Sequence, residues 1–280
     1  MNEEEQRARI MDESYLEEVE GIALTELNTN AVIPTSFDVR VKWPACTSIK
    51  TIRDQSACGS CWAVSGASTM SDRLCFQSNG KIKKFVSDAD ILACCGSLCG
   101  CGYVFPNNKA LEPPLLVCKG GFTIRAWQFA TSTGVCTDGA YAQKGVCKPY
   151  PFHTCGQRCP GSFYPTPACE KKCRPDTQNR THQIDLKVAQ KHLIMMCCSE
   201  VFILCNKQCE SYPKGNPHRW RNKKFTCYQV TGWGVEKNLP YRLISNSWNS
   251  DWGENDLFRI LRGKNECGIE TRVVAGMMQV

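Results

Sequence analysis

The sequence predicts a disulfide-rich globular fold of one or two domains. Its 280 residues are 42% hydrophobic, which is enough to build a sizeable core. No apolar run approaches the ~18 residues of a membrane-spanning helix, so no membrane partner is expected. Twenty-one cysteines, clustered between Cys46 and Cys173, indicate a disulfide framework built in an oxidising compartment, and their odd number leaves at least one thiol over.

The formal net charge of +7 does not by itself indicate a nucleic-acid partner. The 34 basic residues are scattered and form only short pairs, such as Lys83-Lys84 and Lys223-Lys224. A nucleic-acid-binding protein gathers its basic residues on one face, so a solvated surface is the better interpretation. No nucleic-acid partner is therefore expected.

A zinc site is the alternative use of the cysteines. Cys95 and Cys99, or Cys205 and Cys209, have tolerable ligand spacing. No histidine lies at finger distance from either pair, which favours disulfides. The sequence calls for no metal and no organic cofactor.

The first 22 residues are charged and lack a basic region followed by an apolar one, so they are not read as a signal peptide. A disulfide-rich chain without a secretory signal is contradictory. The simplest resolution is a sequence that starts inside a longer precursor.

Residues 54–65 combine a turn, a cysteine and a stretch of small and apolar residues that can be helical as far as Cys75. Cys61 then lies at the start of a helix, where free N–H groups and the positive end of the helix dipole favour the thiolate. A nucleophilic cysteine needs that environment. The alternative is that Cys61 is one more half-cystine.

The same segment matches the active-site signature of the papain family of cysteine peptidases, and the chain resembles the invertebrate cathepsin B type. Residues 33–38 and 43–46 resemble the mature start of cathepsin B. Residues 1–32 then resemble the tail of its inhibitory propeptide, and residues 33–280 the peptidase domain. The resemblance implies an α+β, papain-like fold with a helical left lobe, a β-barrel right lobe and the cleft between them.

The resemblance also implies roles for individual residues. Gln55 and the Cys61 backbone N–H match the donors of the oxyanion hole. Residues 118–121 match the glycine wall of the cleft, where a bare backbone pairs with an extended peptide. Residues 245–253 match the segment whose asparagine orients the catalytic imidazole under a covering tryptophan. The expected site residues are catalytic Cys61, Gln55 and Asn246, and substrate-binding Gly120, Gly121, Trp248 and Arg272.

Six disulfides are implied by the resemblance, and each closes a loop. Family precedent supports the pairing, which spacing alone does not determine. The implied pairs are Cys46–Cys75, Cys58–Cys118, Cys94–Cys169, Cys95–Cys99, Cys147–Cys173 and Cys155–Cys159.

The chain lacks the histidine base where the family has one. Attack by a cysteine on an amide needs a base that pairs with the thiolate and later protonates the leaving amine. Alignment on residues 232–234 places Thr226 at that position, and threonine has no basic lone pair of useful pKa. Loss of one member of such a unit lowers turnover by about 10⁴–10⁶, so the chain is expected to be close to inert. Each of the four histidines is read as an ordinary surface residue: His153, His182, His192 and His218.

Residues 197–229 are anomalous. They hold five cysteines and lack the alternating apolar pattern of a barrel strand, and they follow a helix-like stretch from Lys187 to Met196. Read one nucleotide later, codons compatible with residues 226–229 permit His-Ala-Ile-Lys, and those of residues 214–220 permit a second family motif. We hypothesise that residues 197–229 are a frameshifted translation and that the authentic protein has its histidine.

Three departures from the family bear on substrate. Residues 102–117 are inserted before the glycine wall, as a surface loop or a retained intron. The Cys155–Cys159 loop is short and has no pair of histidines to bind a C-terminal carboxylate, so endopeptidase action is expected rather than dipeptidyl carboxypeptidase action. Arg272 occupies the position of an acidic pocket residue, which should repel arginine at P2 and tolerate apolar or acidic side chains.

Two functions follow, from different classes. The first is an endopeptidase of a lysosomal or extracellular compartment, impaired in this copy, with protein or peptide substrates. The second is a non-catalytic homologue that binds peptides, propeptide-like segments or cystatin-like inhibitors without cutting them. A cysteine-rich structural protein would leave the combination of Gln55, Cys61 and Asn246 unexplained.

Overall fold

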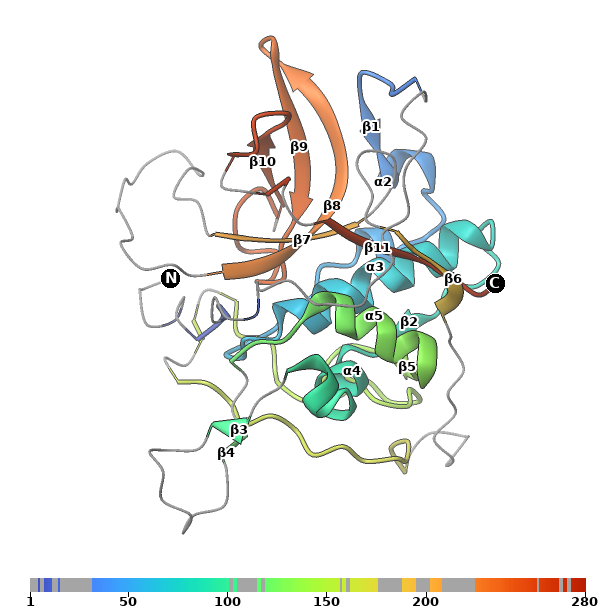
Figure 1. Ribbon diagram of the computed structural model, residues 1–280, viewed down its shortest axis with the longest axis vertical. Coiled ribbons are helices and arrows are strands. Elements are labelled where there is room, and N and C mark those ends of the chain that lie inside the picture. Colours follow the sequence, from blue (N-terminus) through green and yellow to red (C-terminus); the bar gives the residue numbers. More distant parts are fainter. Residues whose placement is uncertain are drawn as a thin grey trace.

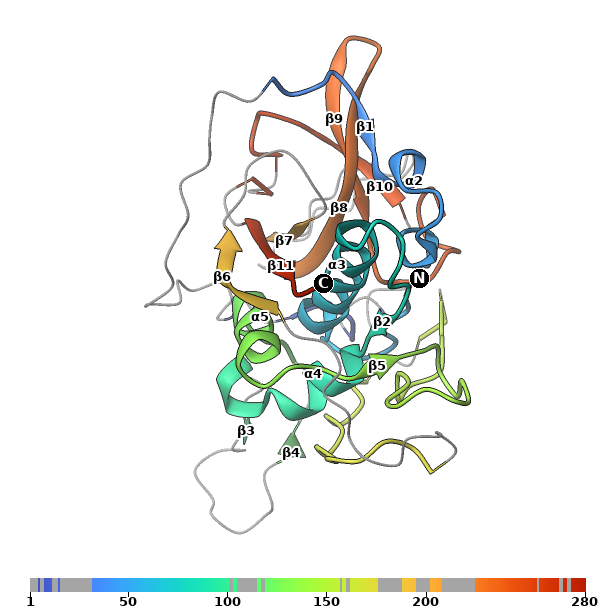
Figure 2. The ribbon, with the colours of Figure 1, turned by 90° about the vertical axis from the view of Figure 1, so that its right-hand side faces the viewer.

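The structure, a computed structural model, describes residues 5, 8–11, 15, 32–100, 103–104, 115–116, 119–156, 158–159, 162–175, 188–194, 202–207, 225–255, 257–266, 269–270 and 273–280. Most helices lie in one lobe and the longer strands in the other, with the long helix α3 between them (Figure 1 and Figure 2). This is the α+β two-lobe arrangement expected from the sequence. No helix among the described residues combines the length and the apolar character that crossing a membrane requires.

Helix α3 is the centre of the molecule and carries Cys61 as its first residue. It extends to Gln77 and so confirms the helix expected after Cys61. It packs against other helices and against strands of the sheet, so nearly all of its side chains are buried. Ser65 and Ser71 are tolerated inside because each hydroxyl donates to the carbonyl four residues earlier, both at 2.6 Å. The helices and 3₁₀ turns are α2 (Val39–Lys42), η2 (Thr47–Lys50), α3 (Cys61–Gln77), α4 (Asp88–Cys94), η3 (Gly96–Cys99) and α5 (Thr123–Ser132).

The second lobe is an antiparallel seven-stranded sheet in the order β10-β9-β8-β7-β11-β6, with β1 paired to β8. The register of β8 against β9 pairs Gln229 with Ser245. This pairing brings the start of β8 beside the segment that follows β9, where Asn246 and Trp248 lie. The strands are β1 (Phe37–Asp38), β6 (Val188–Ile194), β7 (Phe202–Lys207), β8 (Phe225–Glu236), β9 (Leu239–Ser245), β10 (Leu257–Leu261) and β11 (Val273–Met278).

Two short ribbons complete the strands. β2 (Phe85–Val86) pairs with β5 (Thr137–Asp138) in the helical lobe. β3 (Tyr103–Val104) pairs with β4 (Leu115–Leu116) inside the inserted segment 102–117. The rest of that insertion lies outside the described residues.

One expectation about local structure was wrong. The helix-like stretch from Lys187 to Met196 contains strand β6, which pairs with β11. Ladder hydrogen bonds to β11 override the local helical preference. Residues 197–229 contain β7 and the start of β8, although they lack an alternating apolar pattern. Residues 226–230 are buried on both faces of β8, and a strand covered on both sides has no polar–apolar alternation to detect.

Five of the six expected disulfides are present among the described residues, and Cys118 of the sixth pair lies outside them. Cys58 and Cys227 are each disulfide-bonded as well. The Cys95–Cys99 bond removes the zinc alternative at that pair. Of the described cysteines, Cys61 and Cys136 are free and buried. The five bonds are Cys46–Cys75, Cys94–Cys169, Cys95–Cys99, Cys147–Cys173 and Cys155–Cys159.

Candidate active site

Cys61 lies at the lobe boundary with a free, fully buried thiol. Burial raises the pKa of this thiol to about 11 and outweighs the hydrogen bonds that favour the thiolate, among them those of the Cys61 and Trp62 backbone at the helix start. A helix N-terminus therefore does not suffice here to ionise the cysteine. The thiol is protonated at neutral pH.

Thr226 lies beside that thiol, at the position that the sequence alignment assigned to the base. Its side chain and the Cys227 backbone both act on the Cys61 thiol and lower its pKa, against the larger effect of burial. Thr226 is fully buried in β8. A threonine hydroxyl cannot hold the proton of a thiol at neutral pH, so the group that faces Cys61 is not a base.

Asn246 follows β9 and is only 5% exposed. Neither its side-chain nitrogen nor its side-chain oxygen has a hydrogen-bond partner among the described residues. Buried polar groups are almost always paired, because leaving one unpaired costs about 1–3 kcal/mol. The two orphan atoms mark a place where a polar partner is lacking.

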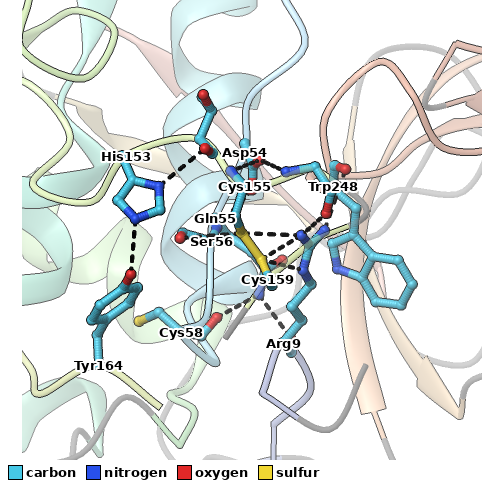
Figure 3. The surroundings of a disulfide bond; sticks show 12 residues. Arg9, Asp54, Gln55, Ser56, Cys58, His153, Cys155, Cys159, Tyr164 and Trp248 are labelled. Carbon is cyan, nitrogen blue, oxygen red and sulfur yellow. Dashed lines mark hydrogen bonds between the residues drawn. A yellow bond between two sulfur atoms is a disulfide. The ribbon is translucent and has the colours of Figure 1, made fainter. Parts of the chain in front are cut away.

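Gln55 is fully buried and its amide is oriented from both ends. The Ser247 hydroxyl donates to Oε1 at 2.6 Å. Nε2 donates to the Cys58 carbonyl at 2.6 Å and to the Arg9 carbonyl at 2.7 Å. The Arg9 carbonyl therefore accepts a hydrogen bond from the side chain that was expected to serve the oxyanion hole, and Figure 3 shows this contact with its surroundings.

The two glycines of the expected wall face different neighbours. A Cβ on Gly121 would collide with the Trp62 indole, and one on Gly120 would collide with the Tyr15 ring and approach Met11. Gly120 also has a φ of 146°, a conformation that side chains disfavour. Both positions therefore need glycine to let the backbone approach a ring or a neighbouring chain segment.

Trp248 is 1% exposed and belongs to the same region, because its backbone bridges to Asp54. Its ring packs edge-on against Trp252, with centroids 5.4 Å apart. Arg272 lies outside the described residues, so the structure does not place the expected P2 pocket residue.

The N-terminal segment lies on the site, which the residue patterns alone did not predict. Ala8, Arg9, Ile10 and Met11 are buried, and the Met11 sulfur lies 3.9 Å from that of Cys227. Tyr15 packs edge-on against Phe122, next to the glycine wall. The only sequence signal was the resemblance of residues 1–32 to a propeptide, which does not say which side chains make contact.

His153 is exposed. Its Nδ1 is 3.1 Å from the Thr154 carbonyl, and its Nε2 is 3.1 Å from the Tyr164 hydroxyl. These contacts fit the expected surface histidine. The side chains of His182, His192 and His218 lie outside the described residues.

Asp54, Cys155 and Cys159 place three potential metal-ligand atoms within 4.8 Å of one another. The two sulfurs are joined to each other. The Asp54 carboxylate accepts the N–H groups of Ser56 at 2.7 Å, and of Cys155 and Gly156 at 2.8 Å each. This cluster therefore fastens the disulfide loop to the start of the Cys61 segment and has no thiolate to offer a metal.

The chain belongs to the papain family of cysteine proteases, whose model matches residues 33–277. Its curated relatives are of the cathepsin B type. It is 38% identical over 268 residues to cathepsin B-like cysteine proteinase 6 of Caenorhabditis elegans, covering 88% of this chain and 66% of that relative. It is 35% identical over 300 residues to cathepsin B-like cysteine proteinase 1 of Ostertagia ostertagi, covering 98% of this chain and 83% of that relative.

Solved structures of proteases in their proform share the fold. Procathepsin B S9 from Trypanosoma congolense has a TM-score of 0.72 at 28% identity, covering 98% of this chain and 88% of its own. A digestive procathepsin L 3 of Tenebrio molitor has a TM-score of 0.58 at 16% identity, covering 97% and 77%, and shows the fold alone.

Proposed function

We propose that this chain is a cathepsin B-like cysteine endopeptidase in which Cys61 is the nucleophile, and that hydrolysis is impaired because Thr226 stands in place of the base. The observation that carries the proposal is the position of Thr226 beside a free, buried Cys61 thiol. Every other position of the candidate site that the structure describes has the residue type that the chemistry needs.

The reaction assigns a task to each of these residues. The Cys61 thiolate attacks the carbonyl carbon of a peptide bond, and the developing oxyanion accepts hydrogen bonds from Gln55 Nε2 and the Cys61 N–H. The leaving amine then takes a proton, and an acyl-enzyme forms that water hydrolyses. Removal of the thiol proton and donation of a proton to the leaving amine both need an imidazole at position 226, which Asn246 would orient. The unpaired side-chain atoms of Asn246 support this assignment, because they lack the partner that such an imidazole would provide.

The second candidate function is peptide binding without cleavage. It is favoured by the N-terminal segment, whose Arg9 carbonyl bonds to Gln55 and whose Met11 and Tyr15 lie at the glycine wall. A site that holds an N-terminal segment while its thiol stays protonated can sequester peptides, propeptide-like segments or cystatin-like inhibitors. This function requires no base.

Three finer points belong to the same proposal. Endopeptidase action is proposed because the Cys155–Cys159 loop has no histidine pair. A P2 pocket that disfavours arginine is proposed from Arg272. Lysosomal or extracellular location is proposed because disulfides persist in oxidising compartments, and five lie within the described residues.

Hydrolysis of a denatured protein distinguishes the two candidates. The wild-type chain is expected to release no fragments, and the Thr226→His chain to release internal fragments. A Cys61→Ser, Thr226→His double variant carries the same N-terminal segment and controls for contaminating proteases. A folded Thr226→His chain that binds a peptide without cleaving it would reject the endopeptidase assignment and favour the binding function.

A further inference from the structure

The Arg9 side chain lies in an enclosed recess beside the candidate site. It is 0% exposed, and its guanidinium lies 5.8 Å from the centre of the Trp248 ring (Figure 3). Nη1 donates to the Trp248 carbonyl at 3.3 Å, and Nη2 donates to the Gly156 carbonyl. The remaining wall is the Cys155–Cys159 disulfide, whose sulfurs lie 3.1 Å from Nε and 3.2 Å from Nη2.

Carbonyl oxygens, sulfurs and a ring face make the contacts in the recess. Behind Gly156 lie two carboxylates. Asp54 binds the N–H groups of Cys155 and Gly156, and an Asp251 oxygen lies 2.5 Å from where a Gly156 Cβ would stand. A ring face and nearby negative charge both favour a cation, and water screens the buried Asp54 carboxylate less than the exposed Asp251 carboxylate.

The geometry discriminates arginine from lysine. Three nitrogens of one planar group reach three separate walls, namely the Trp248 carbonyl, the Gly156 carbonyl and the disulfide. A lysine ammonium is a compact point charge and cannot contact all three walls from one position.

The disulfide loop presents its carbonyl because of its backbone. Gly156 has a φ of +50°, and a Cβ there would meet Asp251. Asp54 holds the two N–H groups of the loop, which leaves the Gly156 carbonyl free to turn toward Arg9. The disulfide joins two cysteines that are four positions apart in the sequence, and the short loop that it closes keeps this carbonyl in place.

We propose that this recess is a guanidinium-binding subsite that selects arginine in peptide ligands. In this chain Arg9 itself occupies the recess, while its carbonyl accepts a hydrogen bond from Gln55. A bound peptide would place one of its own arginines in the recess instead. Selection of substrates by this subsite rests on the proposed peptidase function. Guanidinium binding does not, because it needs neither the thiolate nor a base.

Chemical rescue of the full-length Arg9→Ala chain tests the proposal. Ethylguanidinium is expected to raise its melting temperature saturably, by about 2–4 °C near ten times the dissociation constant, and to leave wild type unchanged because Arg9 fills the recess. Ethylammonium tests charge without the planar fork, and ethylurea tests the fork without charge. Equal shifts in wild type and variant, or an equal rescue by ethylammonium, would overturn the proposal.

A second measurement covers an Arg9→Ala chain that fails to fold. Modification of Arg9 by phenylglyoxal, mapped by mass spectrometry, should be at least about tenfold slower in the native wild-type chain than in urea, and faster in Asp251→Asn than in wild type. An unprotected Arg9, or no effect of Asp251→Asn, would contradict the subsite. If ethylguanidinium rescues Arg9→Ala and the separate Thr226→His chain is inactive, the guanidinium subsite is supported and the peptidase function is rejected.

Discussion

Replacing Thr226 by histidine should convert the buried thiol into a reactive thiolate. The side chain at 226 faces Cys61, and the unpaired amide of Asn246 is available to orient an imidazole there. A protonated imidazole stabilises the thiolate by a short-range ion pair, which opposes the burial that now raises the pKa of Cys61.

The size of the effect follows from two opposing terms. With the pKa of Cys61 at about 11, about 10⁻⁴ of the thiol is ionised at pH 7. Pairing with histidine brings cysteine pKa values to about 3.5–7.5, which raises the thiolate population by about 10⁴. A less basic thiolate is intrinsically less nucleophilic, by about 10² over this range. Alkylation of Cys61 should therefore accelerate by about 10², while hydrolysis, which also needs proton donation to the amine, should gain about 10⁴–10⁶.

The predicted acceleration of Cys61 alkylation is measured with iodoacetamide at pH 7. Mass spectrometry reads the labelling at both described free thiols, Cys61 and Cys136. Cys136 is an internal reference, because it is buried and its pKa is also raised by burial. Thr226→Gln is the matched control, since it has similar bulk and no base. An unchanged ratio of Cys61 to Cys136 labelling in a folded Thr226→His chain would refute the reasoning.

Two further predictions concern stability. Gly121→Ala places a Cβ against the Trp62 indole and should lower the free energy of unfolding by about 1–3 kcal/mol in urea titrations; an unchanged midpoint would show that the wall can relax. Burial raises the pKa of Asp72, which accepts from Gln229 Nε2 at 2.7 Å, from 3.8 to about 7. The folded state thus keeps a proton that the unfolded chain loses, so this contribution to stability is complete below about pH 4 and is lost as the pH rises toward 7. Asp72→Asn should therefore gain stability relative to wild type between pH 4.5 and 7.5, and a constant difference would contradict the shift.

Local patterns predicted the centre of the site because its chemistry is local. A turn, a cysteine and a run of small residues specify a helix start, and α3 begins at Cys61 as expected. The alignment that placed Thr226 opposite the nucleophile used motifs in one strand, and the strand carries that residue to the thiol. Neither step needed knowledge of distant contacts.

Long-range contacts account for what the patterns missed. The stretch from Lys187 to Met196 looks helical alone but forms a strand because β11 supplies its ladder partners. The start of β8 shows no alternation because both of its faces are covered. The Arg9 side chain has its binding recess only because it contacts Gly156 and Trp248, which lie 147 and 239 residues away along the chain.

The sequence alone determined the family, and it predicted Cys61 as the nucleophile with no base opposite it, since each depends on residue identity at a few spaced positions. Only the tertiary structure decided that the thiol is un-ionised, that the Asn246 amide lacks a partner among the described residues, and that the recess beside Trp248 encloses a guanidinium. These properties depend on burial and on groups brought together from distant segments, and neither is encoded in any one stretch of chain.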